Sequence, residues 1–166
     1  MRILGIDPGL QVCGYACLEI AGDKETLIEA GVFRTDSTLV IEEKLNRIAE
    51  DTRSLLKEFK PRIVAVEELY SHYRHPKTAI LMGHARGVIL QSCAEAAIEV
   101  KSFAATRIKK SITGNGRAPK QQMQRAIQAI LSLPRLPEPD DVADAVAVAM
   151  CCANEANSIL VANDQM

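Results

Sequence analysis

Three apolar segments open the chain, and each has the length and residue content of a β-strand. They span residues 2–8, 12–20 and 26–34, and Pro-Gly and Ala-Gly-Asp turns separate them. Strands that follow one another through such short connections pair in antiparallel fashion. The pattern therefore predicts a three-stranded antiparallel meander.

The pattern then changes to a helical period. From Ser37 onward, apolar residues recur along one helix face until Pro61 ends the helix. Residues 62–67 form a short, almost wholly apolar run, which is typical of a strand that is covered on both faces and parallel to a neighbour. A polar loop leads to a long helix over residues 78–97 and a short strand over 99–103.

Small residues are frequent in the helix over residues 78–97, and they permit close approach of another backbone. They are Gly83, Ala85, Gly87, Ala94, Ala96 and Ala97. Packing against the sheet explains them, and an additional contact between two copies of the chain would also use them. Both interpretations stay open at this point.

Three further helical segments complete the chain. They are a short one over residues 106–112, a helix over 119–133 and a last helix over 140–154. We expect residues 155–166 to form a flexible C-terminal tail. The whole pattern predicts a single α/β domain over residues 1–154, with a mixed five-stranded sheet flanked by helices.

The composition agrees with one globular domain of 166 residues, 48% of them hydrophobic. No window reaches the roughly 18 apolar residues of a membrane span, and the N-terminus begins a strand instead of a signal peptide, so we expect a cytoplasmic protein. The five cysteines are odd in number and lack a CxxC pair. They are expected to be buried thiols and not zinc ligands.

Charge is distributed unevenly along the chain. Residues 69–125 contain ten basic and two acidic residues, a net charge of +8, whereas the remainder carries −9. The overall charge of −1 argues against a general nucleic-acid binder, but a basic third suits a face that binds a polyanion. Solvated helix faces explain the distribution equally well.

Acidic residues stand where buried elements end or begin. Asp7 and Glu67 each end an apolar strand, and parallel neighbouring strands, about 4.8 Å apart, would bring their carboxylates side by side. Asp141 and Asp144 share one face at the start of the last helix. Asp140 is the better candidate for capping that helix. Taken singly, each acid also has an ordinary structural explanation.

Taken together, Asp7, Glu67, Asp141 and Asp144 form a set of oxygen donors without His or Cys. This is the ligand chemistry of Mg²⁺ or Mn²⁺. One or two such ions would activate a water molecule and stabilise the leaving oxygen in phosphodiester cleavage. The basic third of the chain would supply the nucleic-acid surface.

Five ordered motifs resemble those of the RuvC-type Holliday-junction resolvases. They run from about residue 1 to 152 and are GIDPG with GY shortly after it, AVEELY, GHARG, AATRIKKSITGNGRAPKQQMQ and DDVADAVAVA. The resemblance implies a ribonuclease H-like fold and a homodimeric, Mg²⁺-dependent endonuclease. Such an enzyme nicks two like-polarity strands of a four-way DNA junction, leaving 5′-phosphates and 3′-hydroxyls. RuvA- and RuvB-type branch-migration proteins are the implied partners.

The resemblance also implies roles for individual residues. The catalytic, metal-binding acids of the family fall on Asp7, Glu67, Asp141 and Asp144. Its functional lysines fall on Lys109 and Lys120, which suit phosphate contacts or developing charge. Its junction-contacting aromatic falls on Tyr70, for which base stacking and a packing role both stay open. Further DNA contacts are expected from the basic residues Arg74, Lys77, Arg86, Lys110 and Arg117.

The loop over residues 71–77 departs from the family pattern. It carries Arg74, His75 and Pro76 where the family commonly has an Asn and a differently spaced basic residue. The four acids are unaffected by this departure. The family's preference for a short, thymine-centred cleavage sequence is therefore open for this chain.

Other functions are compatible with parts of the sequence. GIDPG also resembles the first phosphate loop of actin-like kinases, but those enclose a nucleotide between two domains, and TGNGRAPK lacks the P-loop spacing. Two alternatives remain. They are a different ribonuclease H-like nuclease and a non-catalytic junction-binding protein.

Overall fold

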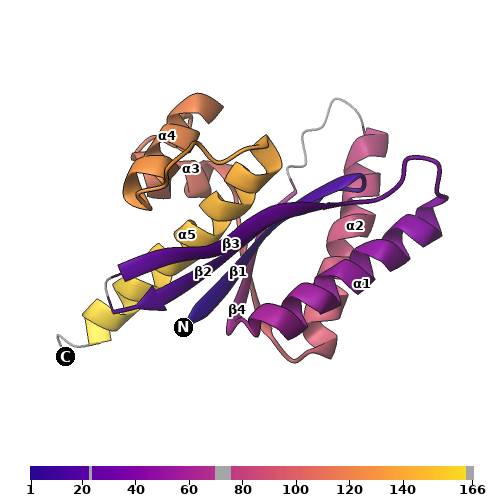
Figure 1. The fold of residues 1–166 in the computed structure, drawn as a ribbon, viewed down its shortest axis with the longest axis horizontal. Coiled ribbons are helices and arrows are strands. Elements are labelled where there is room, and N and C mark those ends of the chain that lie inside the picture. Colours follow the sequence, from indigo (N-terminus) through magenta and orange to yellow (C-terminus); the bar gives the residue numbers. More distant parts are fainter. Residues whose placement is uncertain (23, 70–75, 164–166) are drawn as a thin grey trace.

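A computed structural model of the protein describes residues 1–22, 24–69 and 76–163. Its centre is a mixed five-stranded sheet of order β3-β2-β1-β4-β5 (Figure 1). The strands are β1 (Arg2–Asp7), β2 (Val12–Ala21), β3 (Lys24–Arg34), β4 (Ile63–Glu67) and β5 (Glu99–Phe103). β2 pairs antiparallel with β1 and β3, whereas β4 runs parallel to β1 and β5. The predicted meander and parallel strands are confirmed.

Helices cover both faces of this sheet. Within the described residues they are α1 (Ile41–Phe59), α2 (Pro76–Glu95), α3 (Ala105–Thr113), α4 (Lys120–Ile130) and α5 (Asp140–Asn163). Figure 1 shows α1 and α2 together on one side of the sheet and α5, with α3 and α4 near its start, on the other. The structure is thus an α/β fold, and the predicted five-stranded sheet flanked by helices is confirmed.

Several helix boundaries differ from the sequence-based expectation, among them the start of α1, which lies at Ile41 instead of Ser37. α2 begins two residues earlier, at Pro76, and α4 ends at Ile130, before Ser132 adopts a positive φ of 51°. α5 continues to Asn163, well past the expected end near residue 154. No Gly or Pro follows residue 154 to stop the helix, which explains its continuation. Flexibility of the tail and the domain limit at residue 154 stay predictions.

The alternation of side chains along β1 decides what each residue contacts. Leu4 and Ile6 belong to the core beneath α1 and α2, whereas Ile3 belongs to the core beneath α5. The same alternation holds in β4. With a period of two residues, Asp7 and Glu67 therefore project on the face that α5 covers.

The small residues of α2 divide between two environments. Ala85 is fully buried in the core, which confirms the packing interpretation at that position. Gly87 is exposed, and a Cβ atom placed on it would meet nothing within 4 Å. A contact between two copies of the chain stays a prediction.

The structure confirms that the cysteines are buried thiols. All five are free and buried. The described helices include none that is long and apolar enough to cross a membrane.

Candidate active site

Asp7 and Glu67 end two strands that lie side by side. The register pairs Ile6 of β1 with Val66 of β4, so the two acids are the next residue of each strand. Both are partly buried. This edge of the sheet holds the carboxyl ends of its parallel strands, where α/β folds commonly place their sites.

Two glycines allow α5 to approach the sheet closely. A Cβ atom on Gly14 would lie 1.9 Å from the carbonyl oxygen of Asp141, and one on Gly5 would lie 2.2 Å from that of Ala145. Gly14 is also the register partner of Asp7. The absence of a side chain at these strand positions therefore brings the first turns of α5 against the end of β1.

Burial and mutual repulsion dominate the electrostatics of the acids. The pKa of Asp7 is raised to about 8, first by burial and then by the charges of Asp144, Glu67 and Asp141, while Lys120 opposes the rise. Like charges that raise one another's pKa lie within a short distance of each other. The four acids predicted from the sequence thus form one electrostatic cluster.

Glu67 and Asp144 experience the same environment. Burial raises the pKa of Glu67, and the charge of Asp144 adds to it, while Lys109 and Lys120 counteract the rise. Burial also raises the pKa of Asp144, against the effect of Lys120 and together with that of neighbouring acids on α5. A cation placed among these groups would relieve the repulsion.

Lys120, the first residue of α4, partly supplies such a cation. Its Nζ donates a hydrogen bond to Asp140 Oδ2 at 3.1 Å and lies 3.7 Å from Asp144 Oδ2. Burial lowers the pKa of Lys120, but the hydrogen bond to Asp140 and the charge of Asp144 raise it overall. The side chain is nevertheless 63% exposed, which leaves it accessible to a phosphate group.

The expectation that Asp140 caps the last helix is wrong. It is the first residue of α5, and its carboxylate accepts hydrogen bonds from Lys120 Nζ and from Gln124 Nε2, the latter at 3.3 Å. The helix begins one residue earlier than a cap at Asp140 requires, because the amides of Val142 and Ala143 already bond to the carbonyl of Pro139. Asp140 therefore links α4 to α5.

A cleft of about 160 Å³ opens beside the acids, between the end of β4 and helices α3, α4 and α5. Its polar lining combines two acids with the two predicted lysines, and its apolar lining comes from the three helices. The lining residues are Glu67, Ala105, Ile108, Lys109, Lys120, Met123, Asp144 and Ala147. Asp7 and Asp141 stand outside this lining.

The remaining predicted residues fall into three groups. Lys77, Lys110 and Arg117 are exposed. Arg86 is partly buried, and its Nε donates to the carbonyl oxygen of Glu67 at 3.2 Å while its second terminal nitrogen donates to Ser102 Oγ at 2.7 Å. The other two, Tyr70 and Arg74, lie outside the described residues.

Sequence reasoning missed two features of this site. The first is the close approach of α5 to Gly5 and Gly14. A glycine inside a strand pattern often indicates such an approach, so these two positions could have predicted it. Arg86 was expected to contact DNA, and its pattern gave no indication that it reaches the strand end that carries Glu67. Such a contact depends on how α2 packs, which the pattern along α2 leaves undetermined.

The donor set suits a hard divalent cation. Carboxylate oxygens are what Mg²⁺ and Mn²⁺ prefer, and the raised pKa of Asp7 marks a place where positive charge is favourable. Within the part of the chain that the structure describes, however, no three His, Cys, Asp or Glu side chains already converge as a metal centre. The assignment of the four acids as ligands stays a prediction.

The sheet order, with acids at the ends of β1 and β4 and at the start of α5, defines the chain as a ribonuclease H-like α/β protein. A family model described as crossover junction endodeoxyribonuclease RuvC matches residues 3–152. The chain belongs to the RuvC family.

Individual relatives agree over most of their length. The RuvC of Rhodopirellula baltica is 46% identical over 149 residues, which are 90% of this chain and 84% of that protein. The RuvC of Heliobacterium modesticaldum is 42% identical over 154 residues, covering 93% and 94%. Both are crossover junction endodeoxyribonucleases.

Solved structures give the same result. Thermus thermophilus RuvC superposes with a TM-score of 0.87 at 31% identity, over 95% of this chain and 96% of that one. The same Thermus protein in complex with a Holliday junction substrate gives a TM-score of 0.89. The yeast mitochondrial resolvase Ydc2, at 13% identity and a TM-score of 0.68 over 92% of this chain and 77% of that one, shares the fold.

Proposed function

We propose that this chain is an endonuclease that resolves Holliday junctions in recombination and repair. The observation that carries the proposal is the electrostatic cluster of four acids beside Lys109 and Lys120, at the strand ends of a RuvC-family chain. Its relatives are crossover junction endodeoxyribonucleases, and the similar Thermus structure holds a Holliday junction substrate.

We infer that Asp7, Glu67, Asp141 and Asp144 hold Mg²⁺, for which Mn²⁺ can substitute, as one or two ions per subunit. When bound, Mg²⁺ supplies a Lewis acid that favours ionisation of water and offsets the charge of the phosphate. The support for this inference is that the acids are oxygen donors and that their charges raise the pKa of Asp7. Asp141 and Asp144 are held near the strands by the close contact of α5 with Gly14.

Lys109 and Lys120 are proposed to act on the scissile phosphate. Both line the cleft next to Glu67 and Asp144, so their ammonium groups can bind the nonbridging oxygens and stabilise charge that develops in the transition state. For Lys120 this requires exchanging its contact with Asp140 for the phosphate, and its exposure favours that exchange. Arg86 is proposed to position Glu67 through the carbonyl of that residue.

DNA contacts outside the cleft are proposed for the exposed residues Lys77, Lys110 and Arg117, whose side chains can reach backbone phosphates. Tyr70 and Arg74, outside the described residues, are proposed as further junction contacts. Symmetric nicking of two like-polarity strands requires two acid clusters, and therefore a homodimer. RuvA- and RuvB-type proteins as partners and a cytoplasmic location complete the proposal.

Cleavage of a synthetic four-way junction with end-labelled arms tests the activity. With Mg²⁺ we expect paired nicks at symmetric positions, in two strands of like polarity, and products that DNA ligase seals. A linear duplex of the same sequence should stay largely uncut. Binding of the junction without nicks would indicate a non-catalytic junction-binding protein, and equal cutting of the duplex would indicate a different ribonuclease H-like nuclease.

A further inference from the structure

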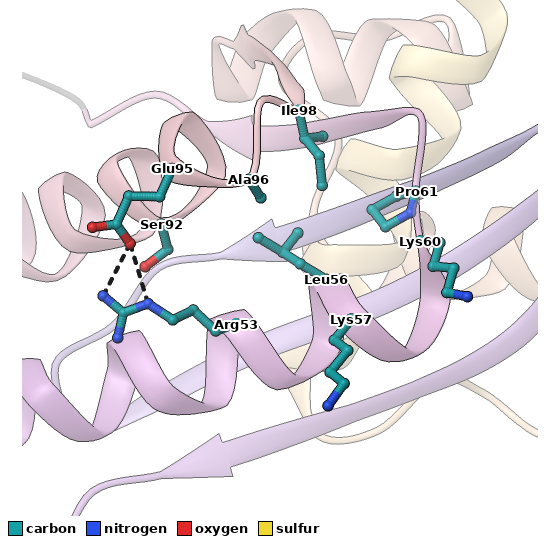
Figure 2. Close-up of a pocket in the computed structure, with 9 residues that line it drawn as sticks. All are labelled: Arg53, Leu56, Lys57, Lys60, Pro61, Ser92, Glu95, Ala96 and Ile98. Carbon is teal, nitrogen blue, oxygen red and sulfur yellow. Dashed lines mark hydrogen bonds and ion pairs between the residues drawn. The ribbon is translucent and has the colours of Figure 1, made fainter.

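A second cavity lies at the opposite edge of the sheet from the acids. It has a volume of about 500 Å³ and is bounded by the last turns of α1 and α2 and by the segments that lead into β4 and β5 (Figure 2). Because β4 and β5 are parallel, this edge carries their amino ends, whereas Glu67 stands at the carboxyl end of β4. The cavity is therefore separate from the catalytic cleft.

Ser92 gives this cavity an unsatisfied hydrogen-bonding group. It is 1% exposed, lies in the cavity lining, and its hydroxyl has no hydrogen-bond partner within residues 1–22, 24–69 and 76–163. A buried hydroxyl normally finds a partner, and in helices the carbonyl four residues earlier often serves. The hydroxyl oxygen is inaccessible in this conformation, and a rotation of the Ser92 side chain toward the cavity would let it donate to an acceptor atom of a ligand.

The charge of the cavity is positive. Glu95 is neutralised, because Arg53 donates to one of its oxygens at 3.1 and 3.2 Å and Gln91 donates to the other. Lys57 and Lys60 also line the cavity, and neither forms an ion pair within the described chain. Both are exposed, on flexible four-carbon stems, so their ammonium groups can turn toward a bound anion.

The floor between these polar groups is apolar. Leu56, which is 5% exposed, points from α1 toward Ala96 and Ile98 on the other side of the cavity (Figure 2). Pro61 closes the end next to Lys60, whose left-handed backbone, with φ of 47°, ends α1 there. Ser92 and Lys60 thus stand on different sides of an apolar surface.

We propose that this cavity is a binding site for a small amphipathic anion. An aromatic or compact apolar body would lie on Leu56, Ala96 and Ile98, a hydrogen-bond acceptor would meet the hydroxyl of Ser92, and a carboxylate or phosphate would face Lys57 and Lys60. The volume falls in the range of small-molecule sites, about 300–1,000 Å³. The inference is independent of the proposed nuclease function, since none of these residues belongs to the acid cluster.

The test uses the full chain and three related probes. 4-Acetylbenzoate has the aromatic body, the acceptor and the charge, 4-acetylbenzamide lacks the charge, and 4-ethylbenzoate lacks the acceptor. In ¹H–¹⁵N spectra, 4-acetylbenzoate should shift the amide signals of Ala96 and Ile98 with a saturable dependence. The uncharged amide should bind at least about tenfold more weakly than 4-acetylbenzoate. 4-Ethylbenzoate should bind severalfold more weakly.

Variants separate binding from folding. The double variant Lys57→Glu/Lys60→Glu should lose about tenfold or more in affinity for 4-acetylbenzoate, whereas Lys24→Glu, an exposed lysine on β3, should bind normally. Ser92→Ala should unfold at the same temperature or higher, because an unpaired buried hydroxyl is removed, yet bind both benzoates equally. Absence of saturable shifts up to roughly 10 mM, unchanged affinity in the double variant, or equal binding of the uncharged amide would overturn the proposal.

Discussion

Asp7 binds its proton far more tightly in the folded protein than a carboxyl group in water does. Its pKa rises from 3.8 to about 8, first through burial and then through the charges of Asp144, Glu67 and Asp141. Between these two pH values the folded state retains a proton that the unfolded state releases. In the absence of metal, the stability associated with Asp7 is therefore complete below about pH 4 and is lost as the pH rises to about 8.

Replacing Asp7 by Asn should remove both the pH-dependent loss of stability and the cleavage activity. We expect Asp7→Asn to abolish junction cleavage while its metal-free melting temperature equals or exceeds that of the unchanged protein. The difference should grow between about pH 5 and pH 8, as the Asp7 proton is lost. Thermal unfolding in a chelating buffer at several pH values measures it. A clear fall in metal-free stability at the upper pH would show that Asp7 serves the fold instead.

Arg86 offers a second test at the scale of one residue. Because its guanidinium holds the carbonyl of Glu67 and the hydroxyl of Ser102, Arg86→Ala should disturb the placement of Glu67 more than the binding of DNA. Single-turnover cleavage is expected to slow about tenfold or more, with junction affinity reduced about threefold or less. Arg86→Lys should restore part of the rate. If Arg86→Ala lowers only the junction affinity and leaves the single-turnover rate unchanged, Arg86 contacts DNA instead of positioning Glu67.

At the scale of elements, the position of α5 depends on glycines in the strands beneath it. Gly14 contacts the carbonyl of Asp141 so closely that any side chain there must displace α5. The sequence predicted that Asp7 and Glu67 would end neighbouring parallel strands, because alternation and crossover rules determine that arrangement. It also placed Asp141 and Asp144 on one face at the start of the last helix. It did not predict the distance between α5 and the sheet.

Gly14→Ala tests this dependence. The added methyl group should cost about 1–3 kcal/mol of stability, as overpacking does, and should reduce cleavage by moving Asp141 and Asp144 away from Asp7. Ser54→Ala is the control, because Ser54 is exposed on α1 and its hydroxyl donates to the carbonyl of Glu50 in the same helix. It should stabilise the chain by about 1 kcal/mol or less and leave cleavage unchanged. Denaturant unfolding and the junction assay measure both effects.

Contacts between elements account for most of what the sequence left undetermined. The pairing of Lys120 with Asp140 joins α4 to α5, and the contact of Arg86 with Glu67 joins α2 to β4. The members of each pair lie far apart in the sequence. Each residue also has an ordinary explanation within its own helix or strand, so nothing in the sequence indicated that they pair. The end of α5 at Asn163 was missed for a different reason, since its boundary depends on helix propensity beyond the last core residues.

At the scale of the whole molecule, charge is separated along the chain. Residues 69–125 carry +8 and the remainder −9, so a chain with a net charge of −1 still has a strongly basic portion. The exposed Lys110 and Arg117 belong to this portion, as does Lys120 at the cleft. Binding of a junction through these groups releases counterions from DNA, and its strength must therefore depend on salt.

We expect the junction affinity to fall by about a thousandfold or more between roughly 50 and 200 mM salt, the dependence of six to ten phosphate contacts. The double variant Lys110→Gln/Arg117→Gln should bind more weakly and lower the salt slope by about one for each phosphate that is no longer neutralised. Lys24→Gln, outside the basic portion, should leave the slope unchanged. Fluorescence anisotropy at a series of salt concentrations gives these slopes, and an unaltered slope in the double variant would exclude both residues from the interface.

The alternation along β1 and β4 has a practical consequence for engineering. Every acid of the cluster stands on the side of the sheet that α5 covers, and the helices α1 and α2 cover the opposite side. Exposed positions on α1, such as Ser54, can therefore carry a fluorophore or a surface tether that stays away from the acid cluster. Immobilised through α1, the molecule would keep its acids turned toward solution and could be observed while it handles a single junction.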